Sequence, residues 1–261
     1  MVLNSTAAQS TTNDEWNSTD PTSTVFSVGS GGNVSGSGQD FVGYCFHSVA
    51  EYSKISTYTG NGSTNGPMVV TGFEPAFLII KRIDSGDNWL TFDNKRNPSN
   101  PRNLGLIPNS SAAESVGNLG NGFNFLSNGF QVISSDSGVN GNGGTYIYIA
   151  FASDPSTSTP TLADSFGLTR YTGNGASGNS ISGLGFQPSL LWLKSYAGTP
   201  GDFSHVVMDS LRGASSSMST NNQNNETINT NGLQSFDSKG FTVGSAAGGW
   251  NYSGTDYVAW A

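Results

Sequence analysis

An Asp-x-x-Arg pair occurs twice in this chain, and its side chains are among the few with enough charge to bind a ligand. Asp93 with Arg96, and Asp209 with Arg212, each follow a run of apolar residues. In a binding loop such a carboxylate would hold sugar hydroxyls or Ca²⁺, with the arginine as a hydrogen-bonding fork. Alternatively, the arginine bridges a strand end and the following turn through the aspartate or backbone carbonyls. Because the pair recurs between different flanking loops, the sequence favours the structural interpretation.

Two glutamates and two aromatic residues complete the set of candidate binding groups. Glu114 and Glu226 occupy matching positions after the two Asp-x-x-Arg pairs, and the same two interpretations apply to them. Trp250 and Tyr252 lie in the glycine-rich stretch "GGWNYSG", where exposed rings would stack on sugars or anchor a partner. The alternative for both rings is packing at the edge of a sheet.

Catalysis needs converging groups, and the sequence supplies few of them. His47 and His205 are the two histidines, and they lie at unrelated positions in the repeats described below. A Ser-His-Asp site would need a histidine beside a nucleophile and an orienting acid. Cys45 matches alanines in the repeats, which is typical of a small strand residue. We therefore expect no catalytic residues and no enzyme activity.

Metal binding is only weakly indicated. The sequence has no Cys/His cluster with the spacing of a zinc site. The stretch "SSDSGVNGNGG" (residues 134–144) offers oxygen ligands for Ca²⁺ but lacks the regular acid spacing of an EF-hand loop, and turn formation explains it. We expect no cofactor and no metal site, with Ca²⁺ as the remaining alternative.

Charge and hydropathy argue against two classes of partner. The net charge is −8, and the ten Lys and Arg residues form no basic stripe to neutralise phosphates, so we expect no nucleic-acid binding. Apolar runs such as "PAFLII" end after five or six residues, too few to span a bilayer, so we expect no membrane insertion. The single cysteine fits synthesis in a reducing cytosol, even for a protein that works outside it.

The elements that must position these residues are predicted to be strands. Glycine accounts for 35 of 261 residues, and charged residues for only 11%, which is typical of short strands joined by Gly and Asn turns. In "TYIYIAFA" (residues 145–152), Ile147, Ile149 and Phe151 share one face, and aromatic and small residues share the other. We expect an all-β fold with very little helix, and the large apolar face as the sandwich interior.

Internal repetition divides the chain into modules. "YTGNG" occurs at residues 58–62 and 171–175, and each copy leads into "GFEP" or "GFQP" and an apolar run. The second halves also match, as "NGFQV" with "KGFTV" and "YIAFA" with "YVAWA". We expect full β-sandwich modules at residues 56–152 and 166–261, joined by a Pro-containing linker at residues 153–165.

Residues 1–55 resemble the second half of a third module. "LNSTAAQS" (residues 3–10) matches "IPNSSAAES" (residues 107–115), "VFSVGS" (residues 25–30) matches "GFTVGS", and "FVGYCF" (residues 41–46) matches "YVAWA". Lone strands would leave backbone groups unpaired and apolar faces wet. We therefore expect an upstream segment or a neighbouring chain to complete this half module.

The ordered series "YTGNG…GFEPAFLIIKR…DNWLTFDNKR…NSSAAES…NGFQV…VNGNGGTYIYIAFA" resembles tandem modules in virion structural proteins of tailed bacteriophages, especially marine and cyanobacterial phages. It covers essentially the whole chain as half a module plus two. The resemblance implies jelly-roll or concanavalin-like β-sandwiches on the virion surface, with no catalytic residues to transfer. The second full module departs from the series at "MSTNNQNNE" and "SYAGTPGDFSH", where we expect different loops but the same strand order.

Together these observations predict a virion-surface or extracellular structural and adhesion protein, as part of a phage tail fibre, spike or capsid appendage. Its partners would be other virion proteins, further copies in a trimer or polymer, and host-surface glycans bound through many weak sites. One alternative is a purely structural subunit whose half module is completed by a neighbouring copy through β-augmentation. Another is a secreted bacterial carbohydrate-binding adhesin, with or without Ca²⁺.

Overall fold

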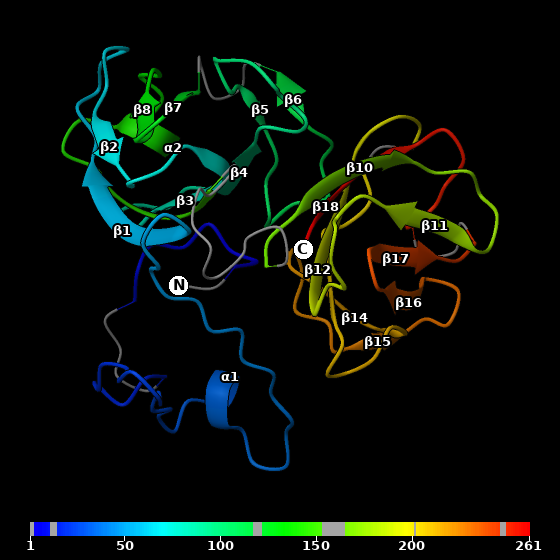
Figure 1. Ribbon diagram of the computed structural model, residues 1–261. Helices are drawn as coiled ribbons and strands as arrows, with labels where there is room; N and C mark the ends of the chain where they lie inside the picture. The colour runs from blue at the N-terminus through cyan, green and yellow to red at the C-terminus, as the bar shows by residue number, and fades with distance from the viewer. Residues whose placement is uncertain (1–2, 11–14, 117–121, 153–164, 201, 246–248) are drawn as a thin grey trace. The chain divides into compact units, whose positions relative to one another are not determined.

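The computed structural model describes residues 3–10, 15–116, 122–152, 165–200, 202–245 and 249–261 (Figure 1). The chain divides into two compact units, residues 1–8 with 48–261, and residues 9–47. Regular structure in the described residues consists of antiparallel strands and two four-residue helices, so the predicted all-β fold with very little helix is confirmed. The predicted linker at residues 153–165 lies, apart from Ser165, outside the described residues.

The first full module is a sandwich of two antiparallel sheets. Its front sheet has the order β1-β9-β3-β4 and is built from β1 (Ser53–Thr59), β9 (Thr145–Ala152), β3 (Pro75–Arg82) and β4 (Trp89–Asp93). Its back sheet has the order β2-β8-β7 and is built from β2 (Met68–Val70), β8 (Gly129–Val132) and β7 (Phe123–Leu126). A short ladder pairs β5 (Leu104–Gly105) with β6 (Ser115–Val116), and helix α2 (Ser137–Asn140) precedes β9.

The second full module repeats this plan with a longer front sheet. That sheet has the order β10-β18-β12-β13-β14-β15, from β10 (Leu168–Thr172), β18 (Asp256–Trp260), β12 (Leu190–Ala197), β13 (Val206–Asp209), β14 (Ser216–Ser219) and β15 (Thr227–Ile228). Its back sheet has the order β11-β17-β16, from β11 (Asn179–Ser182), β17 (Gly240–Val243) and β16 (Leu233–Asp237). In both modules the final strand lies between the first strand and the long apolar strand.

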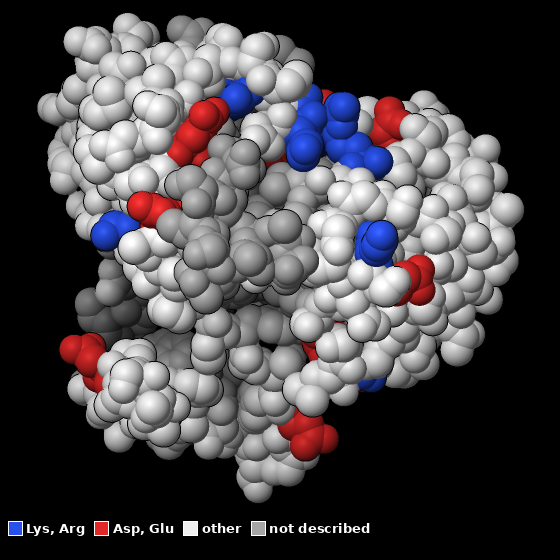
Figure 2. All heavy atoms as spheres, viewed as in Figure 1, with Lys and Arg blue, Asp and Glu red and all other residues white. Residues whose placement is uncertain are grey.

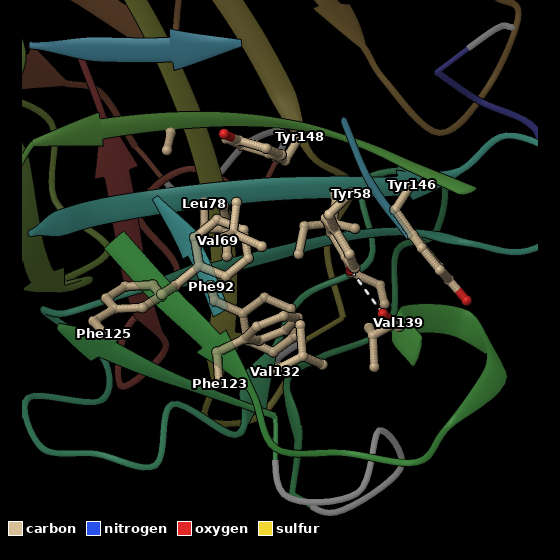
Figure 3. Close-up of a cluster of buried hydrophobic side chains, with 14 of the residues drawn as sticks. Tyr58, Val69, Leu78, Phe92, Phe123, Phe125, Val132, Val139, Tyr146 and Tyr148 are labelled. Carbon is tan, nitrogen blue, oxygen red and sulfur yellow. Dashed lines mark hydrogen bonds between the residues drawn. The ribbon is translucent and has the colours of Figure 1, made fainter. Parts of the chain in front are cut away.

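The two sheets of each module enclose a core rich in aromatic residues, and Figure 3 shows that of the first module. In the first module, Phe92 of the front sheet meets Phe123 of the back sheet with ring centroids 4.8 Å apart. The tyrosine of "YTGNG" stacks on the final strand, because the ring of Tyr58 lies 4.8 Å from that of Tyr146 at an interplanar angle of 11°. Tyr171 stacks on Tyr257 in the same way, at 5.0 Å and 12°. The first residue of the motif is therefore a core residue in both modules.

The two faces of the front sheet are reversed relative to the prediction. Tyr146, Tyr148 and Ala150 of β9 face the sandwich core, whereas Phe151 and Ile149 face a separate cluster between the two modules. This inter-module cluster has as its buried members Phe77, Ile79, Leu106, Phe151, Val258 and Trp260. Alternation sorts side chains into two groups but does not say which group meets the second sheet. Here both faces are covered, and a mixture of aromatic and aliphatic side chains joins the modules.

Residues 9–47 form a unit whose described part contains helix α1 (Gly32–Ser35) and no strand. Residues 25–30 and 41–46, which were predicted to form strands, are in neither helix nor strand. Phe26 in this unit is 48% exposed, whereas Phe130, its match in the first module, is fully buried. Strands need a neighbour for their backbone groups, and the described residues of this unit contain no sheet to provide one. Its completion by another segment stays a prediction.

One turn of the half module nevertheless has the same backbone as its counterpart. Gly31 precedes α1 with φ −61° and ψ 132°, and Asp136 precedes α2 with φ −62° and ψ 135°. Seven residues further on, Gly38 has φ +71° and Gly143 has φ +74°, a conformation that favours glycine. The offset is 105 residues in both comparisons. The backbone of residues 31–38 therefore resembles that of residues 136–143, and the half module at residues 1–55 stays a prediction.

Candidate functional site

The first Asp-x-x-Arg pair is the centre of a buried ionic triad. Oδ1 of Asp93 accepts hydrogen bonds from the backbone N–H groups of Lys95 and Arg96, at 3.0 and 2.8 Å. Nε of Arg96 donates to Oδ2 of Asp93 at 2.7 Å, and its Nη1 donates to Oε2 of Glu114 at 2.9 Å. The side chains of Asp93 and Arg96 are fully buried. The aspartate thus closes the turn after β4 and fixes the arginine.

Arg96 also holds two backbone segments together. Its Nη1 donates to the carbonyl oxygen of Leu104 at 3.1 Å, and its Nη2 donates to that of Thr91 at 3.4 Å. Burial raises the pKa of the nearby Glu114 carboxyl, while the charge of Arg96 opposes that shift. A guanidinium bonded in this way serves as a brace rather than as an open site for a sugar.

The second pair builds the same triad. Nε of Arg212 donates to Oδ2 of Asp209 at 2.6 Å, and its backbone N–H donates to Oδ1 at 2.9 Å. Nη1 of Arg212 donates to Oε2 of Glu226 at 3.0 Å, and Nη2 donates to the carbonyl oxygen of Val207 at 3.4 Å. The geometry supports the structural interpretation of all six residues. The two glutamates, matched by sequence position alone, prove to be the third members.

A residue that the sequence did not identify covers the first triad. Trp260, in the last strand of the second module, donates from Nε1 to Oδ2 of Asp93 at 3.3 Å. Its ring centroid lies 6.0 Å from Cζ of Arg96, within the range of a cation–π contact. The two residues are 167 positions apart, so no local pattern in the sequence marks this contact.

Trp250 is not an exposed ring, and its prediction as a surface anchor is wrong. It is only 4% exposed and belongs to the core of the second module. Its carbonyl oxygen accepts a hydrogen bond of 2.7 Å from the hydroxyl of Tyr171, which orients this loop toward the sandwich. Gly232 leaves room for the indole, since a Cβ there would lie 3.0 Å from the ring. The glycine that makes space for this ring therefore lies outside the glycine-rich stretch "GGWNYSG".

Tyr252 remains at the surface, with 42% of its area exposed. Its ring centroid lies 5.9 Å from that of Phe203 at an interplanar angle of 40°. Its backbone N–H donates to the hydroxyl of Tyr257 at 3.0 Å, which anchors the loop to β18. Of the two predicted aromatic anchors, only Tyr252 is available for contact with a sugar or a partner.

The "YTGNG" turn binds a buried asparagine in each module. Oδ1 of Asn140 accepts from the backbone N–H of Asn61 at 2.8 Å, and the Asn140 carbonyl accepts from Gly62 at 2.8 Å. In the second module, Oδ1 of Asn251 accepts from Asn174 at 2.9 Å, and its carbonyl accepts from the following glycine at 2.7 Å. The motif thus joins the first turn of a module to the loop before its last strand through hydrogen bonds.

Both glycines of the "YTGNG" turn are required by the backbone and its close neighbours. A Cβ at Gly60 would collide with the carbonyl oxygen of Gly141, and one at Gly173 would collide with that of Tyr252. The second glycine of each motif has a positive φ, +69° at Gly62 and +72° at Gly175. The hydroxyls of the motif tyrosines also bond to this loop, at Val139 and Trp250.

Two buried lysines join successive repeats, and sequence inspection did not single them out. Nζ of Lys194, in β12, donates to the carbonyl oxygen of Ser111 in the first module at 2.7 Å. Nζ of Lys81, at the matching position in β3, donates to the carbonyl oxygen of Thr6 at 3.2 Å. Both lysines are fully buried. Thr6 and Ser111 lie at matching positions in "LNSTAAQS" and "IPNSSAAES", so the same contact occurs twice.

We use the term strap for three matching segments. The N-terminal strap (residues 3–8) and the first strap (residues 107–114) receive Lys81 and Lys194. The second strap (residues 219–226) matches them in sequence position. The backbone N–H of Glu114 in the first strap donates to the Tyr196 carbonyl of β12 at 3.2 Å. Oγ1 of Thr220 in the second strap donates to the carbonyl of Pro108 at 2.6 Å. Each lysine therefore belongs to a joint in which a strap lies across the front sheet of the next module.

The joint around Lys194 has a strongly perturbed electrostatic environment. Burial lowers the pKa of Lys194 to about 7, with Asp202 opposing the shift. Burial, with the positive charges of Lys194 and Arg96, also holds the pKa of His205 well below its usual 6.5. Because the indole N–H of Trp192 can only donate, its 3.0 Å bond to Nδ1 of His205 makes that nitrogen an acceptor. His205 is thus a neutral structural residue.

Comparison with known families places the chain in a single group. Its sequence matches the model of a domain of unknown function, DUF7483, over residues 1–155 and 161–261. The chain belongs to this family. No curated protein and no solved structure matches the chain. Family membership therefore adds no activity or ligand to what the residues themselves indicate.

The described residues contain no group of three or more His, Cys, Asp or Glu side chains placed to hold a metal ion. None of the helices in the described part of the chain is long and apolar enough to cross a bilayer. Cys45 is exposed. The expectations about Ca²⁺, nucleic acid and membrane insertion stay predictions.

Proposed function

We propose that this chain is a structural and adhesive component of a virion surface, such as a tail fibre, spike or capsid appendage. The observation that carries this proposal is the repeated joint, in which Lys81 bonds to Thr6 and Lys194 to Ser111. A contact that recurs between successive repeats is typical of modules made to stack. The charged residues at the matched positions serve the same architecture, since both triads brace a strand end.

The composition of the surface suits the adhesive part of this role. Figure 2 shows a face that is mostly free of charged side chains, with acidic groups spread over it and basic groups gathered near its upper centre. Such a surface fits reversible contact with host glycans, where many weak sites act together in a trimer or polymer. Tyr252, beside Phe203, is the aromatic group left to make that contact. Placement on the virion, with other virion proteins as partners, rests on the resemblance to phage modules.

Locating the chain and probing its sugar binding would test this function. Antibody labelling of purified particles should place the chain on a tail or capsid surface, and glycan-array binding should fall with Tyr252→Ala. Met68→Ala, which removes an exposed side chain from β2, is the control. Absence from particles would contradict the virion role. Equal binding by both variants, or no binding at millimolar sugar, would remove the adhesive part and leave the structural one.

A second candidate is a purely structural subunit completed by β-augmentation. It is favoured by residues 9–47, whose large apolar side chains are exposed where full modules bury them, as with Phe26 against Phe130. A strand-bearing first half from a neighbour would cover these groups and pair the backbone. Protection of amides 25–30 and 41–46 from hydrogen exchange in the assembled form, but not in the monomer, would support this role. Equal exchange in both forms would contradict it.

A further inference from the structure

The second strap has the local form of a joint but no lysine on it among the described residues. In all three straps a backbone N–H bonds to a side-chain oxygen two residues earlier: Ala7 to Ser5 at 3.0 Å, Ala112 to Ser110 at 3.1 Å and Asn224 to Asn222 at 3.0 Å. The residue between each pair is Thr6, Ser111 or Gln223. The first two present their carbonyls to Lys81 and Lys194. Gln223, the third, is exposed.

The triad beside the second strap is also less covered than its counterpart. Glu226 has 37% of its side chain exposed, against 16% for Glu114. Arg212 is 14% exposed, whereas Arg96 is fully buried. The difference has a visible cause, because Trp260 of the following module lies over the first triad. The second triad has the same charged groups, so an aromatic side chain can pack over it in the same way.

We propose that the second strap and the Asp209–Arg212–Glu226 triad form a docking face for a second copy of this chain. The second copy binds through the front sheet of its first module. Lys81 of the second copy donates to the carbonyl oxygen of Gln223, as Lys194 does to Ser111 within one chain. The N-terminal strap, which occupies Lys81 in the single chain, is displaced.

A second copy fits this face because one chain carries both sides of the joint. Its second module offers a strap, and its first module offers a lysine-bearing front sheet. The N-terminal strap is held there through Thr6, which accepts from Lys81 at 3.2 Å and from the backbone N–H of Asp87 at 2.9 Å. The internal joint has a shorter lysine bond, 2.7 Å at Ser111, and further bonds at Glu114 and Thr220. The N-terminal strap is thus the weaker occupant.

Such a joint has a direct consequence for assembly. Strap and front sheet are different surfaces, so the contact is head-to-tail, and repetition gives a ring or an open filament. The inference rests on the structural role proposed above, to which it adds the contact between copies. It assigns the N-terminal strap the role of a removable cap.

Disulfide trapping between two single-cysteine chains tests this contact. In a Cys45→Ser background, one chain carries Gln223→Cys and the other Asp87→Cys, whose backbone lies beside the strap in the single chain. A Thr6→Cys, Asp87→Cys double variant is the intrachain positive control. In the negative control, Met68→Cys, on the exposed edge strand β2, replaces Asp87→Cys.

We expect a cross-linked dimer from the Gln223→Cys and Asp87→Cys mixture, and several-fold more of it when residues 1–8 are deleted. No dimer, or as much dimer with Met68→Cys, would overturn the docking face. Because the cross-linking of intact chains is a test by itself, it does not require the chain without residues 1–8 to fold. If the cross-link fails but the chain is found on particles, only the proposed contact between copies is refuted. If the chain is absent from particles, the proposed function itself is refuted.

Discussion

Nζ of Lys194 and the carbonyl oxygen of Ser111 lie 2.7 Å apart across the boundary between the two full modules. The same Nζ donates to the carbonyl oxygen of Phe203 at 2.5 Å. A fully buried lysine with only carbonyl acceptors in direct contact loses hydration that nothing nearby replaces in full. The joint between modules is therefore also a place where folding and protonation are linked.

Stability should rise with pH between about 7 and 10 because of Lys194. Its pKa is about 7 in the folded protein, below the ordinary value of 10.5, so in this window the unfolded chain binds the extra proton. The free energy of unfolding should rise by at most about 1.4 kcal/mol per pH unit from this residue, and its contribution should be constant below pH 7. Urea titrations from pH 6 to 10 would measure the slope.

Lys194→Met should reduce that slope, because the titrating group is gone while the buried volume is kept. Lys239→Met, at an exposed lysine of the same module, controls for the loss of one charge. An unchanged slope in Lys194→Met would show that this lysine is not the linked group.

Asn251→Ala should lower the free energy of unfolding by about 3 kcal/mol, because it leaves several buried backbone groups without a partner. Nδ2 of Asn251 donates to the carbonyls of Ala176 and Gly244 at 2.7 and 2.8 Å, and its Oδ1 holds the "YTGNG" turn. Asn142→Ala, at an exposed asparagine, should change stability by less than about 0.5 kcal/mol. Denaturant unfolding of both variants would check this. Similar losses of stability in the two variants would contradict the stabilising role of the Asn251 hydrogen bonds.

The two triads should differ in their sensitivity to the same substitution. Arg96→Met should cost about 3–5 kcal/mol, since it leaves the fully buried Asp93 without its cation. Arg212→Met should cost less, because its triad is partly open to water. Equal losses in chemical denaturation would mean that the cover from Trp260 has no energetic effect.

Trp250→Ala should destabilise the second module by about 3–5 kcal/mol, as expected for removing a buried indole. Tyr252→Ala, two residues away and largely exposed, should cost below about 1 kcal/mol. Thermal unfolding followed by tryptophan fluorescence and circular dichroism would compare them. A well-folded Trp250→Ala protein with unchanged stability would argue against the core position.

Local patterns in the sequence were sufficient for the repeat and for the two Asp-x-x-Arg pairs. The glycines of "YTGNG" are required by close approach and positive φ, so the motif could be recognised as a module opening wherever it occurred. Asp93 and Arg96 lie three residues apart at a turn, and that spacing alone brings the carboxylate to the backbone N–H of the arginine. Where a contact is made within a few residues, composition and spacing carry the information.

The sequence by itself determined the all-β class and the internal repetition, in which residues 1–55 match a module's second half and two full modules follow, because each depends on short-range alternation, turns and repetition. Only the tertiary structure decided which face of β9 is interior, that Trp250 is buried, and that Lys81 and Lys194 clamp straps. These properties depend on contacts between residues that are tens to hundreds of positions apart in the sequence, such as the contact of Trp260 with Asp93. An alternating strand specifies two faces equally, and packing against its neighbours selects between them.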